Sequence, residues 1–339
     1  MKPTDFSYHL ANYLAKYLPG MAGLSINTIS SYRDMFTLLI KFYENVQSIP
    51  PENLNLKDFN QENIETFLGW LEKERNNSVP TRNVRLAAIH AYAKYVGRVC
   101  PELMHEMQKI QSIPFKKGPK GNLEYISIEA MTMLLSLPDT RTKDGKRDSV
   151  MLSLMYDTGC RVQELCDLKV SDVRIQKPST VKVTGKGNKT RIIPIMNAMS
   201  KLLENYMQVK GFHQREKSCY PLFTNRSGEK LTRKGVAYIL NKYFLMAKEI
   251  DPSIYPEKLS PHCTRHSKSM HLLQSGVNLI YIRDLLGHTD IKTTEVYARI
   301  DSEMKRKALE QSQNITPSEK EPEWQANKEL LEWLRSLGR

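Results

Sequence analysis

A break in the hydrophobic pattern divides this sequence into two parts and most constrains its fold. The segment SIPFKKGPKGNLEY holds two prolines, two glycines and three lysines, with little apolar periodicity. Because prolines and glycines interrupt helices and strands, we expect a basic linker over residues 113–125. At 339 residues the chain is long enough for one domain on each side of it.

Residues 1–112 predict an all-α helical bundle. Phe6, Leu10 and Leu14 recur at helical spacing, and Pro19 with Gly20 is expected to end this first helix. Further helices are expected after the capping candidates Ser25 or Asn27, Asn60 and Ser78. The basic residues expected on exposed faces include Arg33, Lys41, Arg82, Arg85 and Lys94.

Residues 126–312 predict a second, mostly helical domain with a small antiparallel β-sheet. Helical patterns cover about 128–137, 146–157, 196–210 and 233–249. In TVKVTGKGNKTRIIPI, β-branched runs flank GKGN, which predicts a hairpin. Later helices are expected from near Thr264 to Gly276 and from Asn278 to Gly287. The expected fold class is therefore mainly α with a small antiparallel sheet, preceded by a helical bundle.

The segment 313–339 is expected to be a flexible polar stretch followed by an amphipathic helix. Trp324, Leu331 and Leu334 share one side of that helix, and Trp333 lies close to it. An apolar face of this kind needs a partner, either on its own domain or on a neighbouring subunit.

Charge and cysteine content narrow the class of protein. Lys and Arg number 50 against 37 Asp and Glu, for a net charge of +13, which favours a polyanionic partner such as nucleic acid. The five cysteines form no CxxC pair and no zinc pattern, so we expect reduced thiols in a cytoplasmic protein. The polar N-terminus and the lack of 18 consecutive apolar residues predict neither a signal peptide nor a membrane span.

Six positions carry the groups needed to attack a phosphodiester without a metal. A phenol can displace an ester oxygen, guanidiniums can hold the added negative charge, and an amine and imidazoles can move protons. These candidate residues are Arg161, Lys186, His262, Arg265, His288 and Tyr297.

Each position also has an ordinary structural explanation. Arg161 begins a predicted helix, where it would stand beside free backbone N–H groups, but a lone arginine there is usually a surface residue. Lys186 lies at the tip of the GKGN turn, where a lone lysine is usually just solvated, and the GxxxxGK[ST] spacing of a P-loop is missing. His288 and Tyr297 are weak signals alone, and their joint spacing is the informative one.

His262 and Arg265 stand three residues apart after Pro261 and would share the first turns of a helix. The nearby His266 and His271 make a zinc site an alternative. No HExxH motif or acidic ligand at helical spacing accompanies them, so we expect no metal.

These segments together resemble the tyrosine recombinase family, the phage-integrase and Xer-like enzymes. DTGCRVQEL resembles its first arginine box, TGKGNKTR its hairpin lysine, HCTRH its His-x-x-Arg-His box and LGHTDIKTTEVYAR its final histidine and tyrosine box. The order and intervals agree over about residues 126–310, whereas the N-terminal helices resemble the core-binding domain less specifically. Thr264 and Cys160 replace residues that are usually apolar, without removing a chemical group.

The resemblance implies the chemistry. Tyr297 would attack the scissile phosphate and leave a 3′-phosphotyrosine, Lys186 would protonate the leaving 5′ oxygen, and His262 would assist proton transfer. The other three candidates would hold the phosphate, by charge at Arg161 and Arg265 and by a hydrogen bond at His288. No cofactor, ATP or metal is implied.

The resemblance also implies the partners. Double-stranded DNA would be clamped between the two domains, and four protomers would assemble on two sites, with the tail helix exchanged between neighbours. The expected function is site-specific DNA recombination, in integration, excision or resolution. Three alternatives are a type IB topoisomerase that relaxes DNA, a non-catalytic DNA-binding protein of the same fold, and a metal-dependent nuclease, which would need carboxylate clusters that the sequence lacks.

Overall fold

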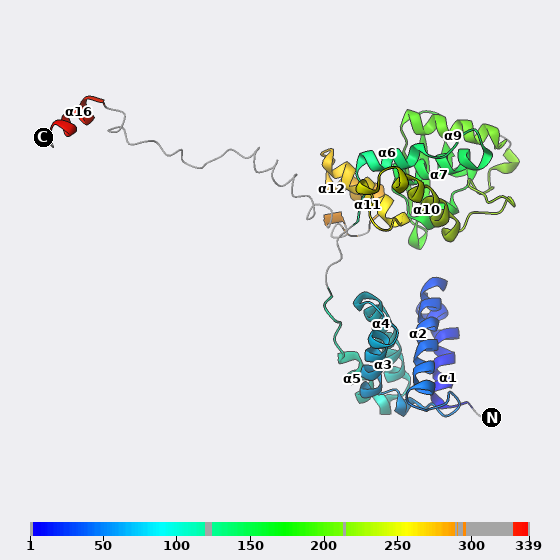
Figure 1. Ribbon diagram of the computed structural model, residues 1–339. Helices are drawn as coiled ribbons and strands as arrows, with labels where there is room; N and C mark the ends of the chain where they lie inside the picture. The colour runs from blue at the N-terminus through cyan, green and yellow to red at the C-terminus, as the bar shows by residue number, and fades with distance from the viewer. Residues whose placement is uncertain are drawn as a thin grey trace. The chain divides into compact units, whose positions relative to one another are not determined.

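The computed structural model describes residues 3–118, 124–212, 215–288, 290, 294–295 and 328–337, without the side chains of Lys186 and Arg215. These residues fall into two compact units, Met1–Gly121 and Asn122–Arg339. Figure 1 labels α1 to α5 in the first unit and α6, α7 and α9 to α12 in the second. The predicted fold class, mainly α with a small antiparallel sheet after an all-α bundle, is confirmed.

The first unit is a bundle of five α-helices around an aromatic core. Phe6, Phe36 and Phe59 all pack against the buried ring of Tyr92. The helices are α1 (Asp5–Asn12), α2 (Ile26–Asn45), α3 (Gln61–Lys73), α4 (Val79–Val99) and α5 (Met104–Ser112), with the short helices η1 (Tyr13–Met21), η2 (Leu56–Asp58) and η3 (Pro101–Leu103) between them.

The structure modifies two predictions for this unit. The first helical segment ends at Met21, one residue after the predicted end, and it passes through Pro19 as the π-helix η1. The wider turn moves the carbonyl that a proline ring would otherwise meet in an α-helix. Arg82 is not exposed: only 6% of its surface is accessible, and its Nη1 donates to the carbonyl of Pro114 at 3.2 Å.

Over residues 124–288 the described part of the second unit combines α-helices with one small sheet. The helices are α6 (Ile128–Ser136), α7 (Lys143–Thr158), α8 (Val162–Asp167), α9 (Asn197–Val209), α10 (Arg233–Ile250), α11 (Pro261–Gln274) and α12 (Leu279–Leu286). The sheet is antiparallel in the order β1 (Val173–Arg174), β2 (Thr180–Thr184) and β3 (Thr190–Pro194). The 3-10 helices are η4 (Val170–Asp172), η5 (Lys186–Asn188), η6 (Arg215–Lys217) and η7 (Pro252–Ile254).

The predicted hairpin is confirmed, whereas α7 begins three residues earlier than expected. In the hairpin, Val183 pairs with Arg191 and η5 forms the tip. Helix α7 begins at Lys143 because the Thr142 hydroxyl caps the N–H of Gly145 at 3.0 Å. Helix α11 begins at Pro261 after the Ser260 cap.

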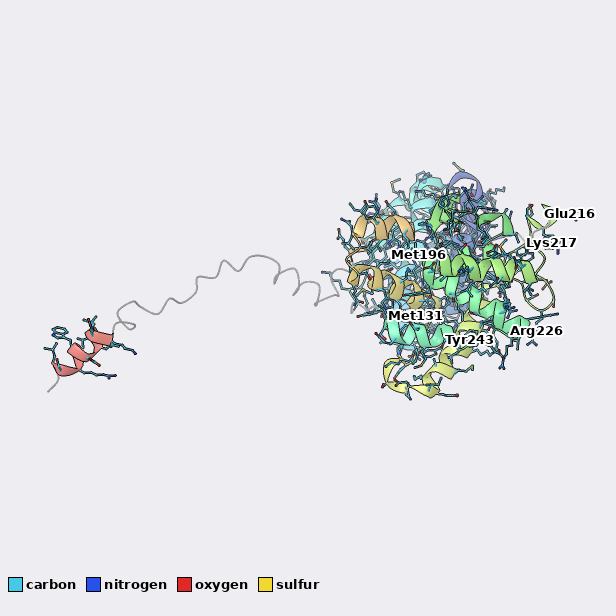
Figure 2. The ribbon with its side chains drawn as sticks, turned by 90° about the horizontal axis from the view of Figure 1, so that it is seen from above. Met131, Met196, Glu216, Lys217, Arg226 and Tyr243 are labelled. Carbon is cyan, nitrogen blue, oxygen red and sulfur yellow. The ribbon has the colours of Figure 1, made fainter. Side chains whose placement is uncertain are left out.

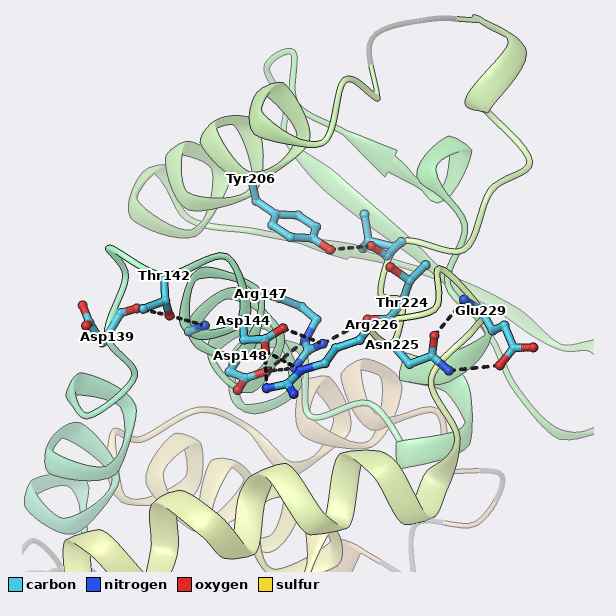
Figure 3. A network of polar contacts seen from close by, with 12 residues as sticks. Asp139, Thr142, Asp144, Arg147, Asp148, Tyr206, Thr224, Asn225, Arg226 and Glu229 are labelled. Carbon is cyan, nitrogen blue, oxygen red and sulfur yellow. Dashed lines mark hydrogen bonds and ion pairs between the residues drawn. The ribbon is translucent and has the colours of Figure 1, made fainter.

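A buried polar network fixes the N-terminal half of α7, the central helix of this unit (Figure 3). Arg147 donates two hydrogen bonds to Asp148 Oδ1, at 2.9 and 2.7 Å, and one to the Thr224 carbonyl at 3.2 Å. The other carboxylate oxygen of Asp148 accepts from the Tyr243 hydroxyl at 3.0 Å. The network ties α7 to α10, and the far end of α7 then leads directly to Gly159 and Arg161.

Apolar side chains complete this unit, and most face inward. Met131 on α6 belongs to the core, whereas Met196 before α9 is 66% exposed. Both residues are labelled in Figure 2. Among the described residues, every helix is too short or too polar to cross a lipid bilayer.

Within the segment predicted as a tail helix, the structure describes a helix, α16, over Lys328–Ser336. Its Trp333 is 57% exposed, so this indole is not buried against the described part of its own chain. Trp324, the other tail tryptophan, lies outside the described residues.

Candidate active site

Arg161 is held by the carboxylate of Glu164 at the start of α8. The Arg161 backbone N–H donates to Glu164 Oε2 at 2.8 Å, and its Nη1 donates to Oε1 at 2.9 Å. The side chain is 38% exposed, so the guanidinium stays open to solvent on one side. The predicted location at a helix start is correct, and Glu164 caps the backbone N–H of Arg161 there.

Arg265 lies one turn inside α11 and is 4% exposed. Its Nη1 donates to the Gly159 carbonyl at 2.6 Å, and its Nη2 donates to the Leu286 carbonyl at 2.7 Å. Gly159 has a φ of 56°, and a Cβ there would meet the Leu286 side chain at 2.9 Å. The turn before Arg161 and the end of α12 therefore meet at the guanidinium of Arg265.

Arg191 lies on β3, and its guanidinium contacts both Glu164 and the end of α12. Its Nε donates to the Leu285 carbonyl at 2.9 Å, and its Nη1 and Nη2 donate to Glu164 at 3.2 and 2.8 Å. Two guanidiniums thus bind the last carbonyls of α12, where a helix dipole favours positive charge. Burial raises the pKa of Glu164, but hydrogen bonds from Arg191 and Arg161 outweigh it and hold this pKa below its usual value.

His288 follows immediately after α12. Burial, followed by the charges of Arg265, Arg161 and Arg191, lowers its pKa to about 4. The imidazole is therefore neutral at pH 7, and its Nδ1 lies 2.9 Å from the Thr294 hydroxyl. Burial and the neighbouring His262 and Arg265 likewise lower the pKa of His266 to about 4.

The remaining candidates are described less completely. His262 is exposed in the first turn of α11, with its ring centroid 6.4 Å from that of His266. Lys186 is the first residue of η5 at the hairpin tip, and its side chain lies outside the described atoms. Tyr297 lies outside the described residues. The described cluster thus joins Arg161, Arg265 and His288 with His266 nearby.

The cluster carries a net positive charge, since it contains three guanidiniums and one carboxylate. Such a site attracts an anion and stabilises negative charge that develops during a reaction. Cys160 lies between these groups, but burial raises the pKa of its thiol to about 11, so it stays neutral. Within the part of the chain that the structure describes, no three His, Cys, Asp or Glu side chains are grouped to hold a metal ion.

Comparison with known proteins identifies the family. The model of the phage integrase family matches residues 124–304. The protein y4rC of Sinorhizobium fredii, whose name places it among integrases and recombinases, is 33% identical over 328 residues, which cover 97% of each chain. The chain belongs to the phage integrase family. The predicted resemblance and the enzyme class of tyrosine-type recombinases are thereby confirmed.

A second relative agrees in sequence, and two solved structures agree in fold. Tyrosine recombinase XerD of Staphylococcus epidermidis is 32% identical over 295 residues, covering 85% of this chain and 93% of that protein. The solved Tn1549 transposon integrase aligns with a TM-score of 0.68 at 15% identity, covering 89% of this chain and 98% of that one. The XerH recombinase aligns with a TM-score of 0.64 at 19% identity, over 87% of this chain and 83% of that one. These two likenesses concern the fold.

In this integrase-family site, sequence reasoning missed Glu164 and Arg191. Glu164 stands three residues after Arg161 at a helix start, and that spacing was a usable signal for a pair on one turn. Arg191 was harder to find, because the adjacent Ile192 and Ile193 hide which face of β3 is buried. In the structure Ile193 is buried and Ile192 is 68% exposed, so Arg191 shares the inward face.

Proposed function

We propose that the chain is a site-specific DNA recombinase that cleaves and rejoins duplex DNA through a 3′-phosphotyrosine intermediate. The observation that carries this proposal is the convergence of Arg161, Arg265 and a neutral His288 at the end of α12, nine residues before Tyr297. DNA as the substrate is supported by similar solved structures, which include a site-specific recombinase bound to its difH substrate and an integrase bound to transposon right end DNA.

In the cleavage step, the phenolic oxygen of Tyr297 attacks the scissile phosphorus while its proton passes to His262. The bond from phosphorus to O5′ breaks, and Lys186 gives its proton to O5′. The products are a 3′-phosphate ester of Tyr297 and a free 5′-hydroxyl. A 5′-hydroxyl from a partner strand reverses the step, so the ester energy is retained and neither ATP nor a metal is required.

Arg161 and Arg265 hold the non-bridging oxygens of the phosphate, and His288 donates a hydrogen bond to one of them. The pentacoordinate state carries one more negative charge than the starting diester, and both guanidiniums are already fixed by the protein. Removing one such preorganised donor costs roughly 2.7–4 kcal/mol of transition-state stabilisation. The pKa of His288 near 4 keeps its imidazole neutral, with one N–H to donate, at pH 7.

Strand exchange requires two sites, so four protomers on two duplexes are the functional assembly. The tail helix α16 supports this proposal, because its exposed Trp333 and Leu334 form an apolar surface suited to a neighbouring protomer. A net charge of +13 supports DNA as the scaffold of that assembly.

The test begins by finding the target. Sheared genomic DNA of the source organism is incubated with the full chain, and fragments that remain linked to protein after denaturation are recovered and sequenced. The recovered sequence is rebuilt as a duplex nicked beside the scissile phosphate, so that the 5′-hydroxyl fragment diffuses away and the adduct accumulates. We expect an adduct with wild type, none with Tyr297→Phe, and an undiminished adduct with the control Tyr281→Phe, an exposed tyrosine on α12.

Two outcomes would overturn the proposal. An adduct that persists in Tyr297→Phe identifies a different nucleophile. Relaxation of supercoiled plasmid that lacks the recovered site, by wild type alone, supports the topoisomerase alternative instead.

A further inference from the structure

Arg191 touches three parts of the candidate active site without being one of the groups that would contact DNA. Its side chain is 13% exposed, and it lies on the inward face of β3 opposite the buried Val183. Its three hydrogen bonds all go to protein groups, two to the Glu164 carboxylate and one to the Leu285 carbonyl. Arg191 therefore adds its charge to the site, and its effect on the geometry of a reaction passes through the residues it holds.

The first of these residues is Arg161, and the connection runs through Glu164. Each carboxylate oxygen of Glu164 accepts one bond from Arg161 and one from Arg191. A shift of the Arg191 guanidinium therefore moves the carboxylate that orients Arg161. Since two guanidiniums share one carboxylate, Arg161 keeps unneutralised positive charge for a phosphate.

Two glycines connect the Arg191–Glu164 pair to Lys186 and to His288. A Cβ on Gly185 would lie 2.8 Å from Glu164 Oε1, and a Cβ on Gly287 would lie 2.9 Å from Arg191 Nη1. The backbone at both positions is thus packed directly onto the Arg191–Glu164 pair. Lys186 immediately follows Gly185, and His288 immediately follows Gly287.

We propose that Arg191 is a positioning residue, whose bonds to Glu164 and to the end of α12 set the locations of Arg161, Lys186 and His288 relative to one another. This inference rests on the proposed function, which assigns the reaction to those three residues. The role requires arginine, because a rigid planar fork can bind a carboxylate at two points and a carbonyl at a third, whereas one ammonium nitrogen cannot span them.

The test compares full-length variants on the nicked duplex under single-turnover conditions. Arg191→Lys keeps the charge and loses the fork, and Glu164→Asp withdraws the carboxylate by one methylene. We expect each to slow covalent cleavage by about 10- to 100-fold, since small misplacements of reacting groups have effects of this size. DNA affinity is expected to change by less than about twofold, because Arg191 is not a DNA contact. The matched control is Arg174→Lys, an exposed arginine on β1 of the same sheet.

A double-mutant comparison separates positioning from a general structural role. In the Arg161→Lys background, Arg191→Lys is expected to slow cleavage by a clearly smaller factor than in wild type, because one of the three residues it positions is already altered. Lowered stability alone would reduce the rate by the same factor in both backgrounds. The urea unfolding midpoints of all variants are measured to compare their stabilities. If Arg191→Lys does not fold, the same comparison is made with Glu164→Asp.

The outcomes distinguish this inference from the proposed function. No adduct with wild type refutes the function itself. An adduct with wild type that forms equally fast in Arg191→Lys and Glu164→Asp, or a full rate penalty in the Arg161→Lys background, refutes the positioning role and leaves the function intact.

Discussion

The carboxylate of Glu164 holds Arg161 at two atoms, the backbone N–H at 2.8 Å and Nη1 at 2.9 Å. Glu164 is 5% exposed and has Arg191 as a second partner, so its negative charge is the counter-ion of two guanidiniums. Removing one partner of a buried ion pair is strongly destabilising, because the remaining charge stays buried without a counter-ion.

Glu164→Gln should lower the free energy of unfolding by about 3 kcal/mol, since the amide keeps the size of the side chain and removes the charge. The free energy is measured by urea unfolding at pH 7. Glu204→Gln on the exposed face of α9 serves as the control and is expected to change it by less than about 0.5 kcal/mol. Equal effects of the two substitutions would show that the carboxylate at Glu164 does not stabilise the fold.

Gly287→Ala should destabilise the protein more than Gly228→Ala, although both glycines have positive φ, 65° and 82°. Each alanine is strained by about 1 kcal/mol in this backbone region. Only at Gly287 does the added Cβ also meet the Arg191 guanidinium, at 2.9 Å, whereas nothing lies within 4 Å at Gly228. Urea unfolding measures the free energy of unfolding of both variants. Equal decreases would show that Arg191 moves away from the added Cβ without destabilising the protein.

The sequence predicted the fold class and the helices of both units, because amphipathic periodicity and capping residues are local signals. It did not predict the path through Pro19, since a π-helical turn depends on the bundle packed around it. The clustering of Arg161 with Arg265 and His288 followed only from the family resemblance. Glu164 and Arg191 lie 27 residues apart in the sequence, and their pairing depends on the register of the hairpin against α8.

Acid should destabilise the protein before its carboxylates titrate. The pKa values of His266 and His288 are near 4 in the folded state, below the value of about 6.5 expected for an unfolded chain. The unfolded state therefore binds more protons between these values, and the free energy of unfolding falls as the pH falls from about 6.5 to about 4. Below that range both states are protonated and these two groups add no further loss.

His266→Gln and His288→Gln test this pH dependence in urea unfolding at intervals from pH 7 to pH 5. In each variant, the free energy of unfolding should fall less steeply as the pH is lowered, because one histidine with a depressed pKa has been removed. His105→Gln, an exposed histidine of the first unit, should leave the slope unchanged. Curves for His266→Gln and His288→Gln that run parallel to wild type would contradict the depressed pKa values.

Removal of residues 313–339 should weaken pairing of two DNA sites more than binding to one site. The tail helix exposes Trp333 and Leu334, which we propose to be buried on a neighbouring protomer. Pairing is measured by energy transfer between two labelled duplexes, and single-site binding by fluorescence anisotropy. Trp333→Ala should reproduce part of the loss, whereas Lys328→Ala at the start of the same helix should not. Unchanged pairing by the truncated chain would exclude the tail from assembly.

Lys186→Ala should slow cleavage by roughly 10²- to 10⁴-fold, the usual contribution of a positioned general acid. The loss should largely disappear on a duplex whose leaving O5′ is replaced by sulfur, because a thiolate departs without being protonated. Lys189→Ala, an exposed lysine on the same hairpin, is the control and should cleave both duplexes like wild type. If sulfur does not restore cleavage by Lys186→Ala, the lysine contributes charge to the phosphate site and another group delivers the proton.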